Sequence, residues 1–251
     1  MTGRVAGDGA AATSPMTNAV LDFRPSRHAF HFANRFQPGK TARLGLFDPR
    51  IMAMGNASFG LCGGMALTVR DMYEKQVDPP PDRDAPVNGS RRFRALVRRQ
   101  VQSLDWFRLP LRFYSLSAIH PSAPTWWSRL LGLRSIGDAV LNDEWPAIRR
   151  EIDGGHLAMV GLVRGESVNP FRLTLNHQVL AYGYQVAPDR VTLRVYDPNH
   201  PDRDDVEARM NLKDGRPTSF ESSTGEPLRG FFLAPYERQE PRAWRADHIP
   251  S

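Results

Sequence analysis

The sequence predicts an α+β fold in which helices come first along the chain and strands follow. Two observations predict it. Before about residue 155, apolar residues recur at three- to four-residue spacing, the pattern of amphipathic helices. After that point the pattern becomes that of extended strands. We therefore expect N-terminal helices packed on a C-terminal antiparallel β-sheet, which is typical of the α+β class.

The first predicted helix runs from about residue 62 to residue 76. It begins at or next to Cys62, which has glycines on both sides. Three consecutive prolines at 79–81 cannot continue a helix, so it ends before them. Its apolar face is formed by Met65, Val69, Met72 and Tyr73.

Three further helices are predicted before the pattern changes. Ser90 is a typical N-cap for the first, which runs to about residue 104. A short second helix carries two adjacent tryptophans, after Pro124. Asn142 or Asp143 is the expected N-cap of the third, which two glycines close at 154–155.

The remaining chain predicts strands joined by short turns. Residues 187–190 (Ala-Pro-Asp-Arg) are a typical turn, so the strands before and after it are expected to form a hairpin. The predicted strands cover residues 156–163, 176–186, 191–196, 206–212, 217–221 and 230–236.

The length of the chain allows one sizeable domain or two small ones. The chain has 251 residues, of which 41% are hydrophobic, enough for a substantial core. We expect a disordered leader over residues 1–20, a single domain over 21–240 and a flexible tail over 241–251.

Charge and hydropathy bear on the classes of partner. The formal net charge is +6, and all but three of the 33 basic residues are arginine. The one arginine cluster, at residues 91–99, fits the solvated face of a helix, so we expect no nucleic-acid partner. No apolar run is long enough to span a membrane, and no secretory signal is recognisable. We expect a cytoplasmic protein, with non-classical export as the alternative; the oligomeric state is left open.

Cys62 is the candidate nucleophile. It is the single cysteine, so no intramolecular disulfide can form. At a helix N-terminus, unpaired N–H groups and the helix dipole favour a thiolate and lower the thiol pKa. The alternative is a structural cysteine, because free cysteines are often buried as small hydrophobic residues.

Three further residues complete a candidate catalytic set. His177 begins a predicted strand and is a suitable general base for a thiol. Asp197 follows the partner strand, where the hairpin could bring it beside His177 to orient the imidazole. Asn56, six residues before Cys62, could donate from its amide to an oxyanion. Each also has an ordinary structural interpretation, His177 in the core and the other two in turns.

Three segments together resemble the papain-like cysteine peptidase superfamily, in particular its bacterial, bacteriocin-leader-peptidase-like branch. They are GLCGGMA around Cys62, NHQVLAYGY around His177 and VYDPN around Asp197. The resemblance implies a papain-like fold in which the cysteine opens the central helix. In that family a glutamine usually lies six residues before the cysteine, whereas this chain has Asn56.

The resemblance implies thiolate attack of Cys62 on an amide carbonyl of a peptide or protein substrate. Two alternatives stay open. One is a thiol acyltransferase or amidase of the same fold, such as a transglutaminase or deamidase. The other is an inactive papain-like binding module, because Asn56 replaces the usual glutamine.

No cofactor and no metal are expected. His28 and His31 have a spacing that could seat a metal, but no cysteine or carboxylate pair lies nearby in the sequence. An acidic segment does not have the spacing of a calcium-binding EF-hand loop, so we interpret it as solvated. Its oxygen-bearing residues are Asp197, Asn199, Asp202, Asp204 and Asp205.

Overall fold

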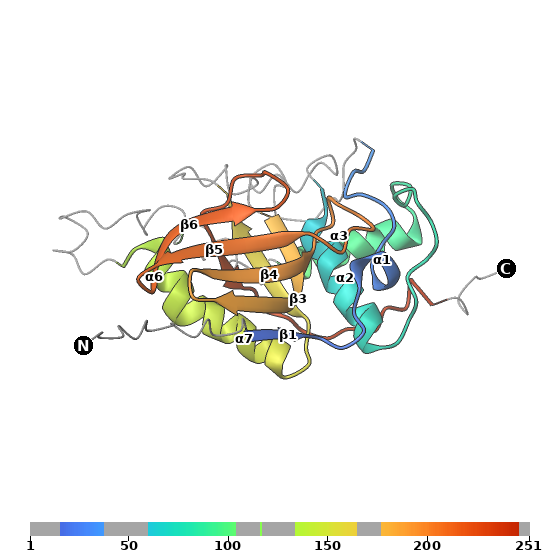
Figure 1. Ribbon diagram of the computed structural model, residues 1–251. Helices are drawn as coiled ribbons and strands as arrows, with labels where there is room; N and C mark the ends of the chain where they lie inside the picture. Colours follow the sequence, from blue (N-terminus) through green and yellow to red (C-terminus); the bar gives the residue numbers. More distant parts are fainter. Residues whose placement is uncertain (1–15, 38–59, 104–115, 117–133, 165–176, 246–251) are drawn as a thin grey trace, which may run out of the picture.

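The computed structural model describes residues 16–37, 60–103, 116, 134–164 and 177–245. Its helices are α1 (Pro25–His28), α2 (Cys62–Glu74), α3 (Arg91–Ser103), α6 (Ile136–Ala139), the π-helical turn η3 (Val140–Glu144) and α7 (Trp145–Asp153). Its strands are β1 (Met16–Ala19), β2 (Ala158–Val163), β3 (His177–Ala187), β4 (Arg190–Tyr196), β5 (Glu207–Lys213), β6 (Arg216–Ser222) and β7 (Gly230–Leu233). Apart from β1, helices precede strands, as the α+β prediction requires (Figure 1).

The strands form one open antiparallel sheet in the order β6-β5-β4-β3-β2-β7. The long strand β3 organises it. One edge of β3 pairs with β4, while the other is shared between β2, at residues 177–181, and β1, at residues 183–186. A register shift between Ala181 and Gly183 interrupts the β3–β4 ladder.

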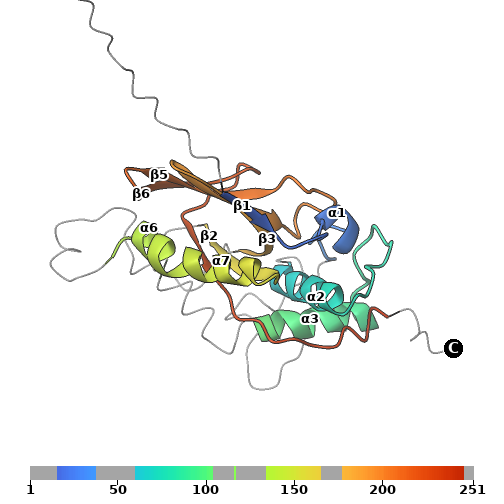
Figure 2. The ribbon, with the colours of Figure 1, turned by 60° about the horizontal axis from the view of Figure 1, so that its bottom comes forward.

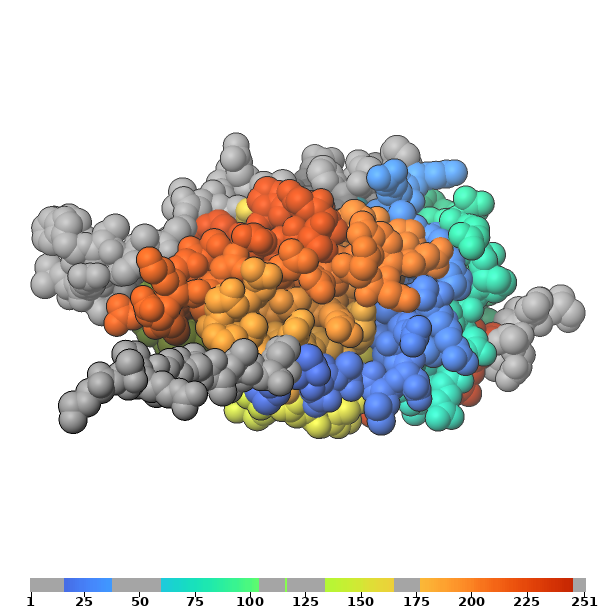
Figure 3. All heavy atoms as spheres, viewed as in Figure 1, coloured from blue at the N-terminus to red at the C-terminus, as the bar shows by residue number. Residues whose placement is uncertain are grey.

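Helices α2, α3, α6 and α7 lie on one side of the sheet (Figure 2). Helix α7 packs against β1, β2, β3 and β7, and α2 packs between β3 and α3. This is why β2 is buried along its whole length and β3 along its first eight residues. The opposite side of the sheet contributes part of the surface seen in Figure 3, and β6 at the sheet edge alternates between exposed and partly buried residues.

The six predicted strands are confirmed to within a few residues, as are the first two helices. The predicted N-cap of the third helix is wrong. Helical structure begins earlier, where the Ser135 hydroxyl accepts a hydrogen bond from the Asp138 N–H, and it continues through η3 into α7. Asn142 lies inside η3 instead of capping a helix. The short helix predicted after Pro124 lies outside the described residues.

Both predicted termini need correction. Residues 16–19, assigned to a disordered leader, form β1 and pair with β3. Residues 241–245, assigned to a flexible tail, lie against the domain, because Trp244 is buried and packs on the ring of Phe30. The folded part of the chain therefore extends beyond residues 21–240 at both ends.

Within the described ranges, no helix is long and apolar enough to cross a membrane.

Candidate active site

Cys62 is the first residue of α2, as the sequence predicts. Leu61, at the N-cap position, has no side chain that can cap the helix. Two amide side chains from elsewhere accept the neighbouring N–H groups instead. Asn34 Oδ1 accepts from the Leu61 N–H at 2.5 Å, and Gln100 Oε1 accepts from the Gly64 N–H at 2.8 Å. The helix start is thus held by a segment before α2 and by α3.

His177 and Asp197 meet below the surface. His177 is the first residue of β3 and Asp197 follows the last residue of β4. The distance from His177 Nε2 to Asp197 Oδ1 is 2.6 Å, and the two residues are only 4% and 2% exposed. A carboxylate at this distance fixes the orientation of the imidazole and stabilises its charged form.

Cys62 hydrogen bonds to the same imidazole. Asp197 engages Nε2 of His177, which leaves Nδ1 of the same ring for a second partner. The Gln178 backbone N–H donates a second hydrogen bond to the Cys62 sulfur. The structure therefore brings together Cys62, His177 and Asp197, which lie far apart in the sequence.

The three groups shift one another's pKa values. Burial alone would raise the pKa of the Cys62 thiol, but His177 and the Gln178 N–H lower it below its ordinary value. Burial alone would lower the pKa of His177, but Asp197 and Cys62 raise it to about 10. Burial alone would raise the pKa of Asp197, but His177, the Asn199 N–H and Arg164 together lower it below its ordinary value. The contact between Cys62 and His177 therefore favours the thiolate of the one and the imidazolium of the other.

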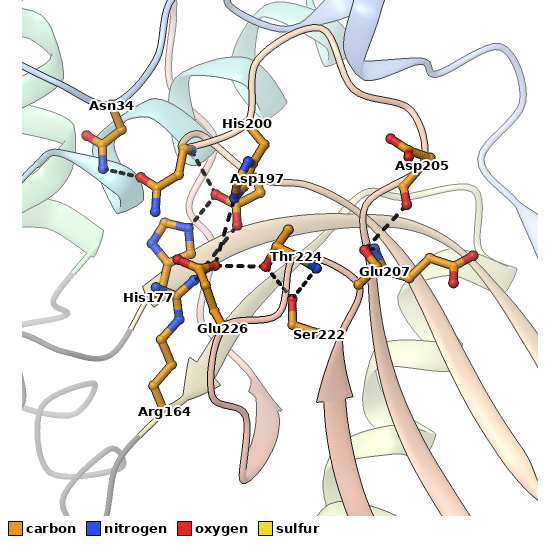
Figure 4. Close-up of polar contacts among 12 residues, drawn as sticks. Asn34, Arg164, His177, Asp197, His200, Asp205, Glu207, Ser222, Thr224 and Glu226 are labelled. Carbon is orange, nitrogen blue, oxygen red and sulfur yellow. Dashed lines mark hydrogen bonds and ion pairs between the residues drawn. The ribbon is translucent and has the colours of Figure 1, made fainter.

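Both carboxylate oxygens of Asp197 have further polar contacts (Figure 4). The Asn199 N–H donates to Asp197 Oδ1 at 2.8 Å, and the Arg164 guanidinium lies 3.9 Å from Oδ2. Arg164 also forms an ion pair with Glu226 at 2.7 Å. These contacts keep the Asp197 carboxylate ionised although it is buried.

Asp197, His200 and Glu226 offer ligand atoms that all lie within 4.8 Å of one another, a possible metal-binding group. However, Arg164 already contacts both carboxylates, and Asp197 is the partner of His177. Arg164 therefore already places a positive charge beside these two carboxylates, where a metal ion would otherwise place one.

The other candidate metal ligands are engaged separately. His28 Nδ1 accepts from the Arg24 N–H, while His31 Nδ1 lies 2.5 Å from Asp202. In the acidic segment the carboxylates have different partners. Asp202 contacts His31 and Arg83, Asp204 contacts Ser26, and Asp205 contacts Arg203.

Asn56, the predicted oxyanion donor, lies outside the described residues. Sequence reasoning missed three supporting residues, Asn34, Gln178 and Arg164. Gln178 had a local signal, because it directly follows His177. The other two lie 28 residues before Cys62 and 33 residues before Asp197, in segments without a recognisable motif.

Comparisons with protein-family models, with curated proteins and with solved structures found no match.

Proposed function

We propose that this protein is a papain-like cysteine peptidase that uses Cys62, His177 and Asp197 as its catalytic set. The observation that carries the proposal is the hydrogen-bonded chain from the partly buried thiol to a buried imidazole and a buried carboxylate. A thiolate held beside an imidazolium is the activated form of a cysteine nucleophile.

The proposed reaction is acyl transfer to the thiol. The Cys62 thiolate attacks the carbonyl carbon of a peptide or protein substrate and forms a tetrahedral intermediate. The C–N bond then breaks, the amine leaves with a proton from His177, and a thioester remains on Cys62. Water attacks the thioester while His177 accepts its proton, which releases the carboxylic acid and restores the thiolate.

The oxyanion of each intermediate needs hydrogen-bond donors. The N–H of Cys62 at the start of α2 is one candidate. Asn56 remains the proposed side-chain donor, in the place of the family's glutamine.

The first test is the rate at which iodoacetamide alkylates Cys62 as a function of pH, followed by mass spectrometry. We expect rapid labelling to persist below about pH 6 in the wild type and to be lost in His177→Ala. His156→Ala is the matched control, because it removes an exposed histidine and should leave the profile unchanged.

Labelling that rises only near the ordinary thiol pKa in both wild type and His177→Ala would contradict the proposal. That result would favour the inactive binding module.

The second test measures activity on unfolded protein substrates, with Cys62→Ala as the inactive control. Release of an amide product in the presence of an added amine would instead identify the acyltransferase alternative, because the amine would replace water at the thioester.

A further inference from the structure

Asn34 connects the two halves of the candidate active site, although it belongs to no helix or strand. Its Oδ1 accepts from the Leu61 N–H at 2.5 Å, and its Nδ2 donates to Asn199 Oδ1 at 3.1 Å. Its backbone N–H donates to the Pro198 carbonyl at 2.8 Å. One residue therefore makes three hydrogen bonds to two distant segments.

Those two segments carry the reacting groups. Leu61 directly precedes Cys62, whereas Pro198 and Asn199 directly follow Asp197. The Asn199 N–H in turn donates to Asp197 Oδ1, the atom that faces His177. A continuous hydrogen-bonded path thus runs from the residue before the nucleophile, through the Asn34 amide, to the carboxylate that orients the base. Figure 4 shows the part of this path between Asn34 and Asp197.

The chain around Leu61 is shaped to receive this amide. Gly60 has φ +85°, a conformation that L side chains rarely adopt, and a Cβ at this position would overlap the Asn34 amide. Glycine at 60 thus allows the close approach that the hydrogen bond to Leu61 requires. The Asn34 amide is therefore packed closely against the backbone at Gly60, unlike the side chain of a loosely placed surface residue.

The hydrogen bond from the Leu61 N–H to Asn34 also fixes the direction in which α2 begins. Asn34 accepts the Leu61 N–H and Gln100 accepts the Gly64 N–H. Between them, the N–H groups of Cys62 and Gly63 have no hydrogen-bond acceptor among the residues that the structure describes. The two amide side chains therefore hold the backbone on either side of the nucleophile.

We propose that Asn34 is a positioning residue that holds Cys62 in register with the His177–Asp197 pair. The inference rests on the proposed thiol chemistry and deepens it. The imidazole contact is a principal cause that lowers the pKa of the Cys62 thiol, so a small displacement of α2 relative to the Asp197 turn should raise that pKa and slow alkylation at pH 6.

The test compares pH profiles of Cys62 alkylation by iodoacetamide in wild type, Asn34→Ala, Asn199→Ala and the double variant. We expect Asn34→Ala to react about tenfold more slowly at pH 6, with its profile displaced by about one pH unit towards alkali. Asn199→Ala breaks only the bond between the two side chains, so its displacement should be smaller. The double variant should react no more slowly than Asn34→Ala, because both changes remove one bridge.

Asn211→Ala is the matched control, because Asn211 also donates its side-chain amide to two partners, Ser219 and Glu221, far from the site. Thermal unfolding of every variant separates positioning from general stability. An Asn34→Ala profile that coincides with the wild type would overturn the inference, whether or not the melting temperature falls. So would an additive effect of the two substitutions.

Failure of the proposed function gives a different result. If the wild type itself lacks reactivity at low pH, the thiolate–imidazolium pair is wrong, and the positioning role falls with it. If the wild type reacts at low pH and Asn34→Ala matches it, only the role of Asn34 is overturned.

Discussion

His177 and Asp197 hydrogen bond to each other although they are not opposite in the β3–β4 ladder. The last pair of that ladder is Leu180 with Tyr196, so its continuation would place residue 179 beside residue 197. His177 is therefore the diagonal neighbour of Asp197, two residues further along the same face. Diagonal neighbours are about 7–8 Å apart at their Cα atoms, a distance that two side chains of this size can bridge.

The first prediction concerns the charge that Asp197 imposes on His177. The pKa of His177 is raised from 6.5 to about 10, so its contribution to folding stability is fully present below pH 6.5 and is lost as the pH rises through about 10. Asp197→Asn removes a principal cause of that rise, and we expect the His177 pKa to fall by more than about one unit. NMR titration of the imidazole nitrogens from pH 6 to pH 11 measures it.

The control for this titration is Asp202→Asn, which removes the carboxylate beside another histidine, His31, and should leave the titration of His177 unchanged. A wild-type His177 that titrates near 6.5 would contradict the prediction. An unchanged pKa in Asp197→Asn would do so equally.

The sequence predicted the elements that depend on local patterns. The three candidate catalytic residues were identified because each stands at the boundary of an element, at the start of α2, the start of β3 and the end of β4. The hairpin does bring Asp197 beside His177, but not directly opposite it. Ala187 pairs with Arg190 and the register shifts between Ala181 and Gly183, so the ladder continues towards residue 179 instead of His177.

Features that depend on distant contacts were not predictable in this way. Strand β1 has the sequence MTNA, is exposed over three of its four residues and is defined by its pairing with β3. Trp244 is buried by packing on Phe30, more than 200 residues earlier. Asn34 contacts Leu61 and Asn199, and no spacing rule links such positions. A sequence without aligned relatives gives no signal for these contacts.

The second prediction concerns a buried ion pair between the helices. Arg99 on α3 lies 2.9 Å from Asp71 on α2, and both are less than 10% exposed. Burial raises the pKa of Asp71 and lowers that of Arg99, and in both cases it outweighs the mutual attraction. Removing Arg99 alone leaves a buried carboxylate without its cation, so Arg99→Met should reduce the free energy of unfolding by about 3 kcal/mol.

Replacing both Asp71 and Arg99 by neutral residues should cost less free energy of unfolding than replacing Arg99 alone. Asp71 also accepts from Tyr236 and from the Gln239 N–H, and an asparagine can still accept those bonds. Asp71→Asn combined with Arg99→Met should therefore recover more than half of the loss measured by urea unfolding at pH 7. A loss below about 1 kcal/mol in Arg99→Met, or no recovery in the double variant, would argue against a desolvation-dominated pair.

The third prediction compares two buried tyrosines in neighbouring strands. The Tyr196 hydroxyl is fully buried and has no hydrogen-bond partner among the described residues, whereas the Tyr182 hydroxyl donates to the Asp204 carbonyl at 2.7 Å. Tyr196→Phe removes an unsatisfied polar group and should raise the free energy of unfolding by about 1 kcal/mol. Tyr182→Phe removes a hydroxyl that has a hydrogen-bond partner, so it should lower the free energy of unfolding by about the same amount. The prediction is wrong if urea unfolding shows that Tyr196→Phe and Tyr182→Phe lose the same free energy of unfolding.

The fourth prediction separates the two glycines that follow Cys62. A Cβ at Gly64 would overlap the Leu96 carbonyl and approach the Gln100 N–H, both of them backbone atoms of α3. A Cβ at Gly63 would meet only side-chain atoms, those of Ser103 and Gln178. Side chains can change rotamer, but a backbone contact is relieved only by moving the helices apart. Gly64→Ala should therefore lower the free energy of unfolding by about 2 kcal/mol or more.

Gly63→Ala is the matched variant, one residue away on the same helix. Alanine favours helix over glycine by about 1 kcal/mol, which offsets part of the cost of displacing two side chains. We expect it to be clearly more stable than Gly64→Ala in urea unfolding, although displacement of Gln178, whose N–H contacts the thiol, should slow Cys62 alkylation at pH 6. If the two variants lose equal stability, the close approach of α3 does not explain Gly64. If Gly64→Ala loses less free energy of unfolding than Gly63→Ala, packing against α3 requires a glycine at position 63 and not at position 64.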